Sequence, residues 1–188
     1  MSAGEWIPVV AKQRVREVRI GADGSETVVV ERLGAYLRNS DGSVMQTLDQ
    51  QSGPGSQGGQ SGEFFDNSTG TRYQLSYSRK TATAVSRGGK LKPKSAENAA
   101  QAEKASSGVK NVNGVLCHGF SMIDGRDGKV IGTGWRSLAN DLHVRSEREL
   151  KVGEYRVVHV KELFDIQLGV EPPQDAFGIP KDFQVVDR

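Results

Sequence analysis

Cysteine and long apolar runs are what this chain of 188 residues most clearly lacks. The single cysteine, Cys117, excludes an intramolecular disulfide and offers no partners for a cysteine-based zinc site. No run approaches the roughly 20 apolar residues that a membrane-spanning helix requires. Residues 1–8 do not combine a basic stretch with an apolar one, as an export signal would. Two localisations therefore stay open: a periplasmic or secreted chain whose signal peptide is absent from this sequence, and a cytoplasmic protein.

An excess of one charge is missing too. The 25 Lys and Arg residues face 23 Asp and Glu residues, a formal net charge of +2, so the charge balance gives no reason to expect nucleic acid as a partner. Hydrophobic residues make up only 36% of the chain, and two polar segments account for much of that deficit. The length suits one domain of ordinary size, and we expect a single β-rich domain over residues 1–188.

The two polar segments are expected to lie outside the core. Residues 50–62, QQSGPGSQGGQSG, contain no apolar side chain to bury and predict a flexible loop. Residues 87–108 form a polar crossover with a basic, solvated start. Within it the alanine-rich stretch 95–105 predicts a short helix or a mobile segment, since so short a helix is marginal alone. Leu91 is the only evident anchor of this crossover.

The remaining chain has the two-residue apolar period of β-strands, most clearly over residues 112–187. Glycine-containing turns such as Asn113-Gly114 separate these runs, and a first meander of about four strands precedes them. The apolar positions change face near Val157 and Val158, which predicts a bulge or bend there. The fold class is therefore mainly β: a strongly curved antiparallel sheet, either a half-open barrel or a meander, with one short helix or crossover segment.

The C-terminal tail combines large apolar residues with proline. Phe177, Ile179 and Phe183 flank Pro180, whose ring is incompatible with a helix interior. Three large apolar side chains would be unfavourable in a tail exposed to water. We expect them to dock onto the sheet and close its core, followed by a short strand.

No pattern of catalytic or metal-ligating residues stands out. His118, His143 and His159 lie on separate predicted strands without metal-ligand spacing. Cys117 is interpreted as a small buried hydrophobe, because neighbouring positions on a strand send Cys117 and His118 to opposite faces. The acidic run beginning at Asp124 lacks the further ligands of a calcium loop and predicts a plain turn. We therefore expect no catalytic residue, no metal and no cofactor.

Several short phrases, in this order along the chain, resemble those of uncharacterised exported bacterial β-rich proteins. They are residues 36–42 (YLRNSDG), 65–75 (FDNSTGTRYQL), 112–119 (VNGVLCHG), 135–137 with 142–144, and 177–183 (FGIPKDF). The ending also resembles that of periplasmic lipoprotein-carrier-like envelope proteins, whose curved sheet forms a half-open barrel. The resemblance implies an exported chain and brings no established activity.

Two functional classes follow. The first is a non-catalytic envelope protein that binds an apolar, lipid-like molecule or a protein partner through the concave face of the C-terminal meander, with Phe120, Trp135, Tyr155 and Val157 as candidate ligand-binding residues. The alternative is a hydrolase whose site is assembled from distant strands, which spacing alone does not reveal. We favour the non-enzyme. If the sheet closes into a barrel, the same four residues belong to an ordinary hydrophobic core. The oligomeric state stays open.

Overall fold

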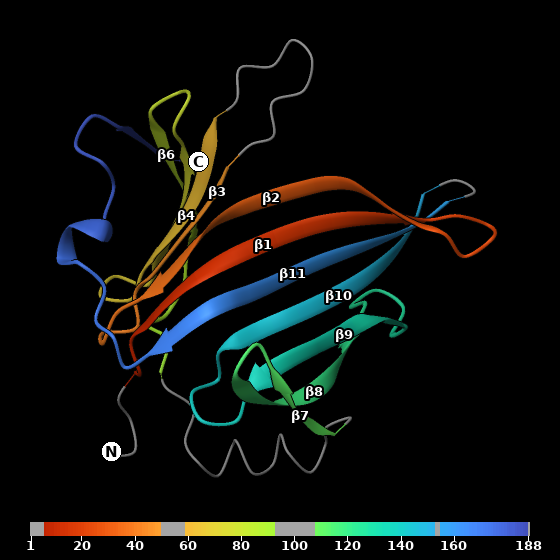
Figure 1. Ribbon diagram of the computed structural model, residues 1–188. Coiled ribbons are helices and arrows are strands. Elements are labelled where there is room, and N and C mark those ends of the chain that lie inside the picture. The colour runs from red at the N-terminus through yellow and green to blue at the C-terminus, as the bar shows by residue number, and fades with distance from the viewer. Residues whose placement is uncertain (1–5, 50–58, 93–107, 153–154, 188) are drawn as a thin grey trace. The chain divides into compact units, whose positions relative to one another are not determined.

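The computed structural model describes residues 6–49, 59–92, 108–152 and 155–187 (Figure 1). These residues form one sheet, with neighbours in the order β12-β6-β5-β4-β3-β2-β1-β11-β10-β9-β8-β7. The bounds are β1 Val9–Ile20, β2 Glu26–Arg38, β3 Val44–Asp49, β4 Gln60–Asp66, β5 Thr71–Ser76, β6 Thr81–Arg87, β7 Val109–Val112, β8 Val115–Ile123, β9 Val130–Ser137, β10 His143–Val152, β11 Tyr155–Leu168 and β12 Gln184–Asp187, with one short 3-10 helix, η1, at Gln174–Ala176. The strands at the two ends of this order do not pair with each other, so the mainly β, open sheet is confirmed.

The sheet divides into two compact units. Unit 1 comprises residues 1–12, 33–93 and 166–188, and unit 2 comprises residues 13–32 and 94–165. Strands β1, β2 and β11 contribute residues to both units. The expectation of a single domain stays a prediction.

The core of unit 1 lies where alternating residues of neighbouring strands meet. Met45, Phe64, Leu75 and Ala82 are buried on β3, β4, β5 and β6, because each strand turns every second side chain to the same side. The tail contributes the half-buried side chains of residues 177, 179 and 183, which pack against this cluster. The docking expected for Phe177, Ile179 and Phe183 is therefore confirmed.

The tail ends in a strand that departs from the expected topology. β12 pairs with β6 in parallel, with Gln184 beside Thr81, whereas the other strand pairings of known register are antiparallel. The Gln184 amide donates to the carbonyl of Lys80 at 2.8 Å, and Lys80 Nζ lies 3.0 Å from the Asp182 carboxylate. A parallel pair requires a long crossover rather than a tight turn, and here residues 88–183, about half of the chain, lie between the two strands.

Both polar segments differ in part from expectation. Residues 60–62 belong to β4 and pair with β3, from Asp49 beside Gln60 to Thr47 beside Gly62. Backbone hydrogen bonds hold this end of the strand, so it requires no apolar side chain. The rest of the expected loop, 50–58, lies outside the described residues.

The crossover 87–108 begins within β6, and its expected helix over 95–105 lies outside the described residues. Leu91 anchors the segment by its backbone rather than its side chain, which is 49% exposed. The Leu91 amide donates to Asn67 Oδ1 at 2.7 Å, and Asn67 Nδ2 donates to the Leu91 carbonyl at 3.3 Å. Leu91 is thus an anchor, but it is held by the buried Asn67 amide through its backbone.

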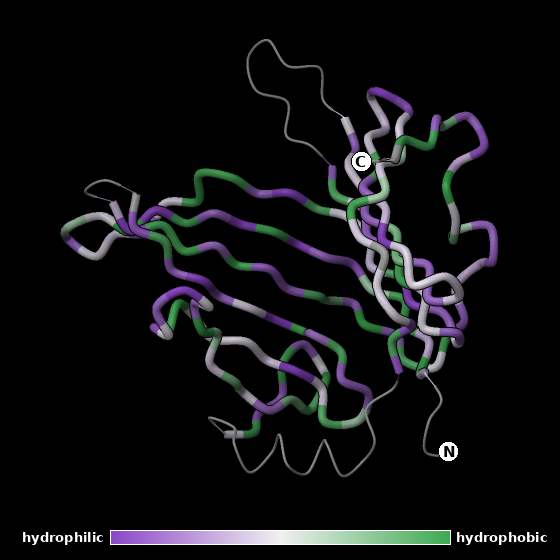
Figure 2. The backbone as a smooth tube through the Cα atoms, turned by 180° about the vertical axis from the view of Figure 1, so that it is seen from behind, coloured by the Kyte–Doolittle hydropathy of each residue, from purple (hydrophilic) through white to green (hydrophobic). Residues whose placement is uncertain are grey.

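The bulge expected near Val157 and Val158 is absent from the pairing of β10 with β11, which runs without a shift from Arg145 beside Glu162 to Val152 beside Tyr155. Both faces of β11 carry apolar side chains, so the apolar pattern changes face while the backbone does not. Figure 2 shows hydrophobic and hydrophilic residues mixed along the strands rather than strictly alternating. Register shifts occur instead between His143 and Arg145, and between Met122 and Ile123.

Candidate binding faces of unit 2

The sheet of unit 2 curls on itself. Asn113, in the turn between β7 and β8, donates through Nδ2 to the carbonyl of Leu163 on β11 at 2.6 Å, although β10 and β9 lie between β11 and β8 in the sheet order. A flat sheet would hold these strands about 14 Å apart, since neighbouring strands are spaced by about 4.8 Å. The β7 end of the sheet therefore rolls over toward β11.

Burial identifies the inner side of this curl. On β7 and β8 the side chains of Val112, Val115 and Cys117 are 0 to 7% exposed. On the opposite side Val109 and Leu116 are 46% and 55% exposed, and only His118 is buried there. We call the first side the inner face; the strand registers place Trp135, Arg145 and Glu162 on it. The other side is the outer face.

The registers separate the four candidate residues. Trp135 pairs with Gly119 and Arg145 and lies on the inner face. Phe120 pairs with Gly134, one position along β8, and therefore points to the outer face. Tyr155 and Val157 share this outer face, through the pairs Val152 with Tyr155 and Leu150 with Val157. The structure thus places three of the candidates on one side and Trp135 on the other.

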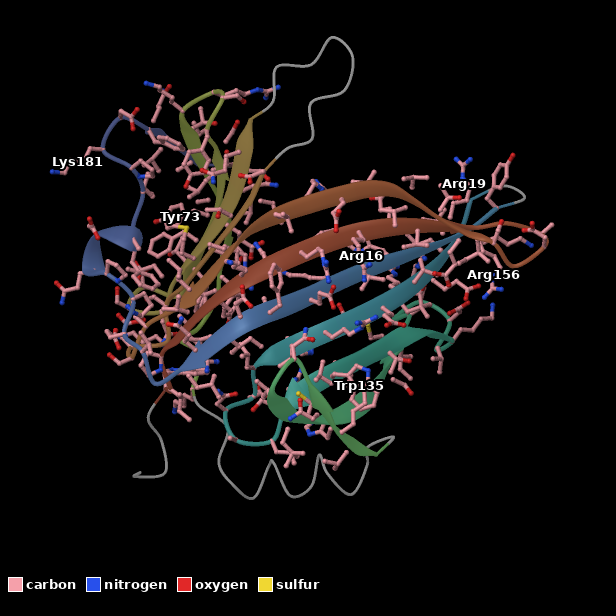
Figure 3. All side chains as sticks on the ribbon, in the orientation of Figure 1. Arg16, Arg19, Tyr73, Trp135, Arg156 and Lys181 are labelled. Atoms are coloured by element: carbon pink, nitrogen blue, oxygen red, sulfur yellow. The ribbon has the colours of Figure 1, made fainter. Side chains whose placement is uncertain are left out.

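Trp135 packs within its own sheet. Its six-membered ring covers Gly119, where an added Cβ would lie 3.0 Å from the ring atoms. Lys110 Nζ lies 3.7 Å from the centre of the ring, within the range of a cation–π contact. Both contacts hold the indole against the inner face, so its packing alone explains its position. Figure 3 labels Trp135.

Phe120 is held in the same way on the outer face. Its ring lies over Gly134 of β9, so close that a Cβ there would collide with it. The imidazole of His143 stacks on the ring at 5.0 Å between centres, and the Arg136 guanidinium lies 5.0 Å from the ring centre. Arg136 also contacts Asp141, with Nη1 3.2 Å from the carboxylate. Gly134 has no side chain, which leaves room for the Phe120 ring on the strand beside it.

Tyr155 and its neighbours are less covered. Tyr155 is 50% exposed and Leu150 39% exposed, and Val157, half-buried, lies directly opposite Leu150. The Arg19 guanidinium lies 4.6 Å from the centre of the tyrosine ring. Arg19, labelled in Figure 3, is near the C-terminal end of β1. Leu150, Tyr155 and Val157 form what we call the apolar strip: accessible hydrophobic surface beside a cation.

A group of cations lies next to this strip on the outer face. Arg148 pairs directly with His159, two residues along from Leu150 and Val157. The pKa of His159 is lowered, first by burial, which disfavours the charged imidazolium. The charges of Arg32, Lys161 and Arg148 lower this pKa as well, and that of Glu17 opposes them. Sequence reasoning missed this group, because only the strand register brings Arg148 of β10 opposite His159 of β11.

The inner face carries a buried ion cluster. Glu162 is 3% exposed and accepts Arg14 Nη2 at 2.6 Å and Nε at 2.8 Å through Oε1, and Arg145 Nη1 at 3.0 Å through Oε2. Arg16 Nη2 lies 3.4 Å from Oε1. Glu147 takes a second contact from Arg145 at 2.6 Å. A buried carboxylate is tolerated because several guanidinium groups replace its lost hydration.

The cysteine and histidine candidates do not form a reactive or metal-binding site among the described residues. Cys117 is fully buried, and burial raises the pKa of its thiol to about 11, so the reactive thiolate is not formed at neutral pH. Cys117 and His118 point to opposite faces, as expected. No group of three or more His, Cys, Asp or Glu side chains in the described part of the chain could hold a metal ion. Among the same residues, no helix is long and apolar enough to cross a membrane.

Comparison with known proteins finds distant likeness only. No protein-family model and no curated protein matches the chain. Among solved structures, a LolA superfamily protein from Nitrosomonas europaea is similar at 10% identity with a TM-score of 0.39, covering 91% of this chain and 90% of that one. A DUF1329 family protein from Desulfovibrio piger is similar at 11% identity with a TM-score of 0.22, covering 91% and 89%. Both overlaps are partial, and function rests on the residues of this chain.

Proposed function

We propose that the chain is a non-catalytic binding protein that takes an apolar, lipid-like molecule on the outer face of unit 2. The observation that carries this proposal is the apolar strip, in which Tyr155 is 50% and Leu150 39% exposed at neighbouring positions of two paired strands. Apolar side chains gathered on an otherwise charged sheet surface are typical of an interaction site. A location in the cell envelope, which the resemblance of the sequence implies, belongs to the same proposal.

The surroundings of the strip favour an amphiphile over a purely apolar molecule. Arg19 covers one side of the Tyr155 ring, and Arg148 is next to Leu150 on the same face of β10. An apolar chain can lie along the strip while the polar end of the same molecule reaches these cations. The long stems of arginine side chains also add apolar surface at such a boundary.

A protein partner that adds a strand is the second candidate. β7 and β12 end the sheet order, so each has one neighbouring strand among the described residues. Val109 on β7 and Val185 on β12 are 46% and 54% exposed. Unpaired strand edges present backbone donors and acceptors that an extended segment of another chain can satisfy.

Binding of the uncharged, environment-sensitive dye N-phenyl-1-naphthylamine tests the proposed function. We expect a saturable rise in fluorescence with the intact protein, which a variant carrying both Leu150→Ser and Tyr155→Ser loses in large part. Each half-exposed side chain is worth about 1 kcal/mol of apolar contact, so the affinity should fall roughly thirtyfold.

Val185→Ser serves as the matched control, because this equally exposed valine lies in unit 1. It should leave dye binding unchanged. Dye binding that survives the double substitution in a folded protein, or that falls equally in the control, rejects the outer face as the binding surface. Native mass spectrometry of the same sample would then reveal whether a second protein chain is bound instead.

A further inference from the structure

We infer that two copies of this chain associate by antiparallel pairing of β2 with β2, over the stretch Glu26–Arg32. We call this stretch the β2 edge; it belongs to unit 2. The inference goes beyond the proposed function, because it concerns the backbone of a strand that carries none of the apolar strip. It therefore holds or fails independently of the proposed ligand.

The β2 edge borders a strand on one side only. β2 pairs with β3 from Tyr36 to Arg38, and β3 ends at Asp49, so the same register would reach no further than Leu33. The other neighbour of β2 in the sheet order is β1, which lies beside it (Figure 1). On the side of β3, no strand of the described ranges pairs with the β2 edge.

The backbone of β2 turns hydrogen-bonding groups to this open side. At the turn that joins β2 to β3, the Asn39 amide donates to the Ser43 carbonyl at 3.1 Å. Backbone N–H and C=O groups of alternate residues point to the same side of a strand, so the odd-numbered residues of β2 face the side of β3. At the β2 edge these residues are Thr27, Val29 and Glu31. Their backbone donors and acceptors can pair with the edge of another strand.

The side chains of the β2 edge do little to prevent such pairing. Neither lysine nor proline, which commonly protect exposed edges, occurs between Glu26 and Arg32. Val28 and Val29 point to opposite faces and are 51% and 41% exposed. The strands at the two ends of the sheet order, β7 and β12, have only four residues each. A longer, apolar and accessible strand edge is a site of association.

A second copy of the chain fits this edge because its sequence, ETVVVER, is self-complementary when two copies run antiparallel. With Val29 on the twofold axis, Val29 of one copy opposes Val29 of the other, and Val28 opposes Val30. Glu26 then lies opposite Arg32 of the other copy, and symmetry repeats this ion pair at the other end. Opposite charges and apolar side chains in directly opposed positions both stabilise a strand pair.

The neighbouring registers match less well. Hydrogen bonding requires residues with outward-facing backbone groups to oppose one another, so the twofold axis must pass through a residue of β2. With the axis one residue later, at Val30, Val29 would oppose Glu31. With the axis one residue earlier, Arg32 would oppose Gly24 and lose its carboxylate partner. The charges therefore select the register centred on Val29.

The interface is small, which sets the expected strength of the dimer. The outward-facing residues Thr27, Val29 and Glu31 of the two copies form about six backbone hydrogen bonds. A contact limited to one strand pair lies at the low end of interface sizes, so we expect a dissociation constant on the order of 10 to 100 µM.

Sedimentation velocity of the intact protein, between roughly 1 and 300 µM, tests the inference. We expect the sedimentation coefficient to rise with concentration from the value of a monomer toward that of a dimer. A monomer over the whole range overturns the inference.

Val29→Pro distinguishes the β2 edge from other surfaces. Proline removes the central outward amide, and its ring obstructs an approaching strand. The fold should persist because the Val29 amide faces away from β1, and circular dichroism checks this. We expect the dependence on concentration to disappear. A folded Val29→Pro protein that still dimerises overturns the inference.

Val109→Pro is the matched control at the edge of β7. Val109 is 46% exposed, and the Gly119 amide donates to the Gly108 carbonyl, so the Val109 amide faces away from β8. This variant should dimerise as the wild type does. Loss of the dimer in Val109→Pro rejects a specific role of the β2 edge.

Exchange of the charges tests the register. Glu26→Arg and Arg32→Glu each place like charges opposite one another at both ends of the interface, so each should weaken association about tenfold. An equimolar mixture of the two variants should associate as strongly as wild type, because the two cations of one chain then face the two anions of the other. Combining both substitutions in one chain should rescue association too, which provides a second test if Arg32→Glu alone folds poorly. Mixtures and double variants no stronger than the single variants reject the pairing centred on Val29.

Discussion

Replacing the buried carboxylate of Glu162 should unfold unit 2 more readily than removing any exposed charge. In Glu162→Gln the side chain keeps its shape, but an amide NH₂ with two donors takes the place of one carboxylate oxygen. Arg14 and Arg145 donate to Glu162 at 2.6 to 3.0 Å, so one of them would face another donor. Three guanidinium groups would also lose the negative charge that they surround.

The size of the effect follows from burial. Breaking a buried ion pair by removing one partner costs about 3 to 5 kcal/mol. Glu162 is 3% exposed, but the side chains of Arg14 and Arg145 are 35% and 30% exposed, so water screens part of the loss. We therefore expect the free energy of unfolding to fall by about 3 kcal/mol, which shifts the urea midpoint down by roughly 1 to 2 M.

Glu149→Gln is the control, because the Glu149–Arg156 pair has the same chemistry with both side chains about half exposed, at 49% and 59%. Urea unfolding in low salt and in 1 M sodium chloride should show a small loss for Glu149→Gln that disappears in salt, and a large loss for Glu162→Gln that persists. Equal losses in the two variants would refute the reasoning that burial decides the strength of the cluster.

Three further predictions concern the tail, the thiol and the sheet. Phe183→Ala should lower the free energy of unfolding by about 2 kcal/mol, less than a fully buried phenylalanine, because Phe183 is half-buried against Tyr77 at 5.2 Å; thermal unfolding checks this, and an unchanged melting temperature contradicts it. Cys117 should resist iodoacetamide at pH 8 until urea unfolds the chain, and stability should fall as pH rises from about 9 to about 11, because the thiol ionises near 9.0 when unfolded but near 11 when folded; prompt alkylation of the folded protein would reject its burial. Gly132→Ala should cost about 1 to 3 kcal/mol, since a Cβ there collides with the backbone carbonyl of Glu147; faster amide exchange along β9 and β10 is the expected sign, and protection equal to wild type would show that the strands can separate without loss.

Local patterns were sufficient for the elements and several of their ends. The turns at Asn113-Gly114 and Asp124 to Gly128 lie where glycine and asparagine predicted them, and Asn113, Gly114 and Gly128 all have positive φ. The docking of Phe177 and Phe183 was also predictable, because large apolar side chains beside proline have no stable place in an exposed tail. These inferences depend only on near neighbours in the chain.

Local patterns misled where backbone pairing replaced side-chain burial. Residues 60–62 have a composition typical of a loop, yet β3 holds them as a strand through main-chain hydrogen bonds. The apolar positions change face at Val157 and Val158, which predicted a bulge. Both faces of β11 carry apolar side chains, however, and the register with β10 is regular.

Residues within a few positions of one another specify most of the strands and their turns, and large apolar residues beside proline indicated that the tail docks but not where. Which side chains share a face came from the tertiary fold alone. Phe120 and Trp135 came out on opposite sides of the sheet, Arg148 came to lie opposite His159, and Glu162 met Arg14 from a position 148 residues away in sequence. Strand register sets these neighbours, and a shift of one residue would reverse every face. Register depends on the sum of many distant pairings, which no local pattern contains.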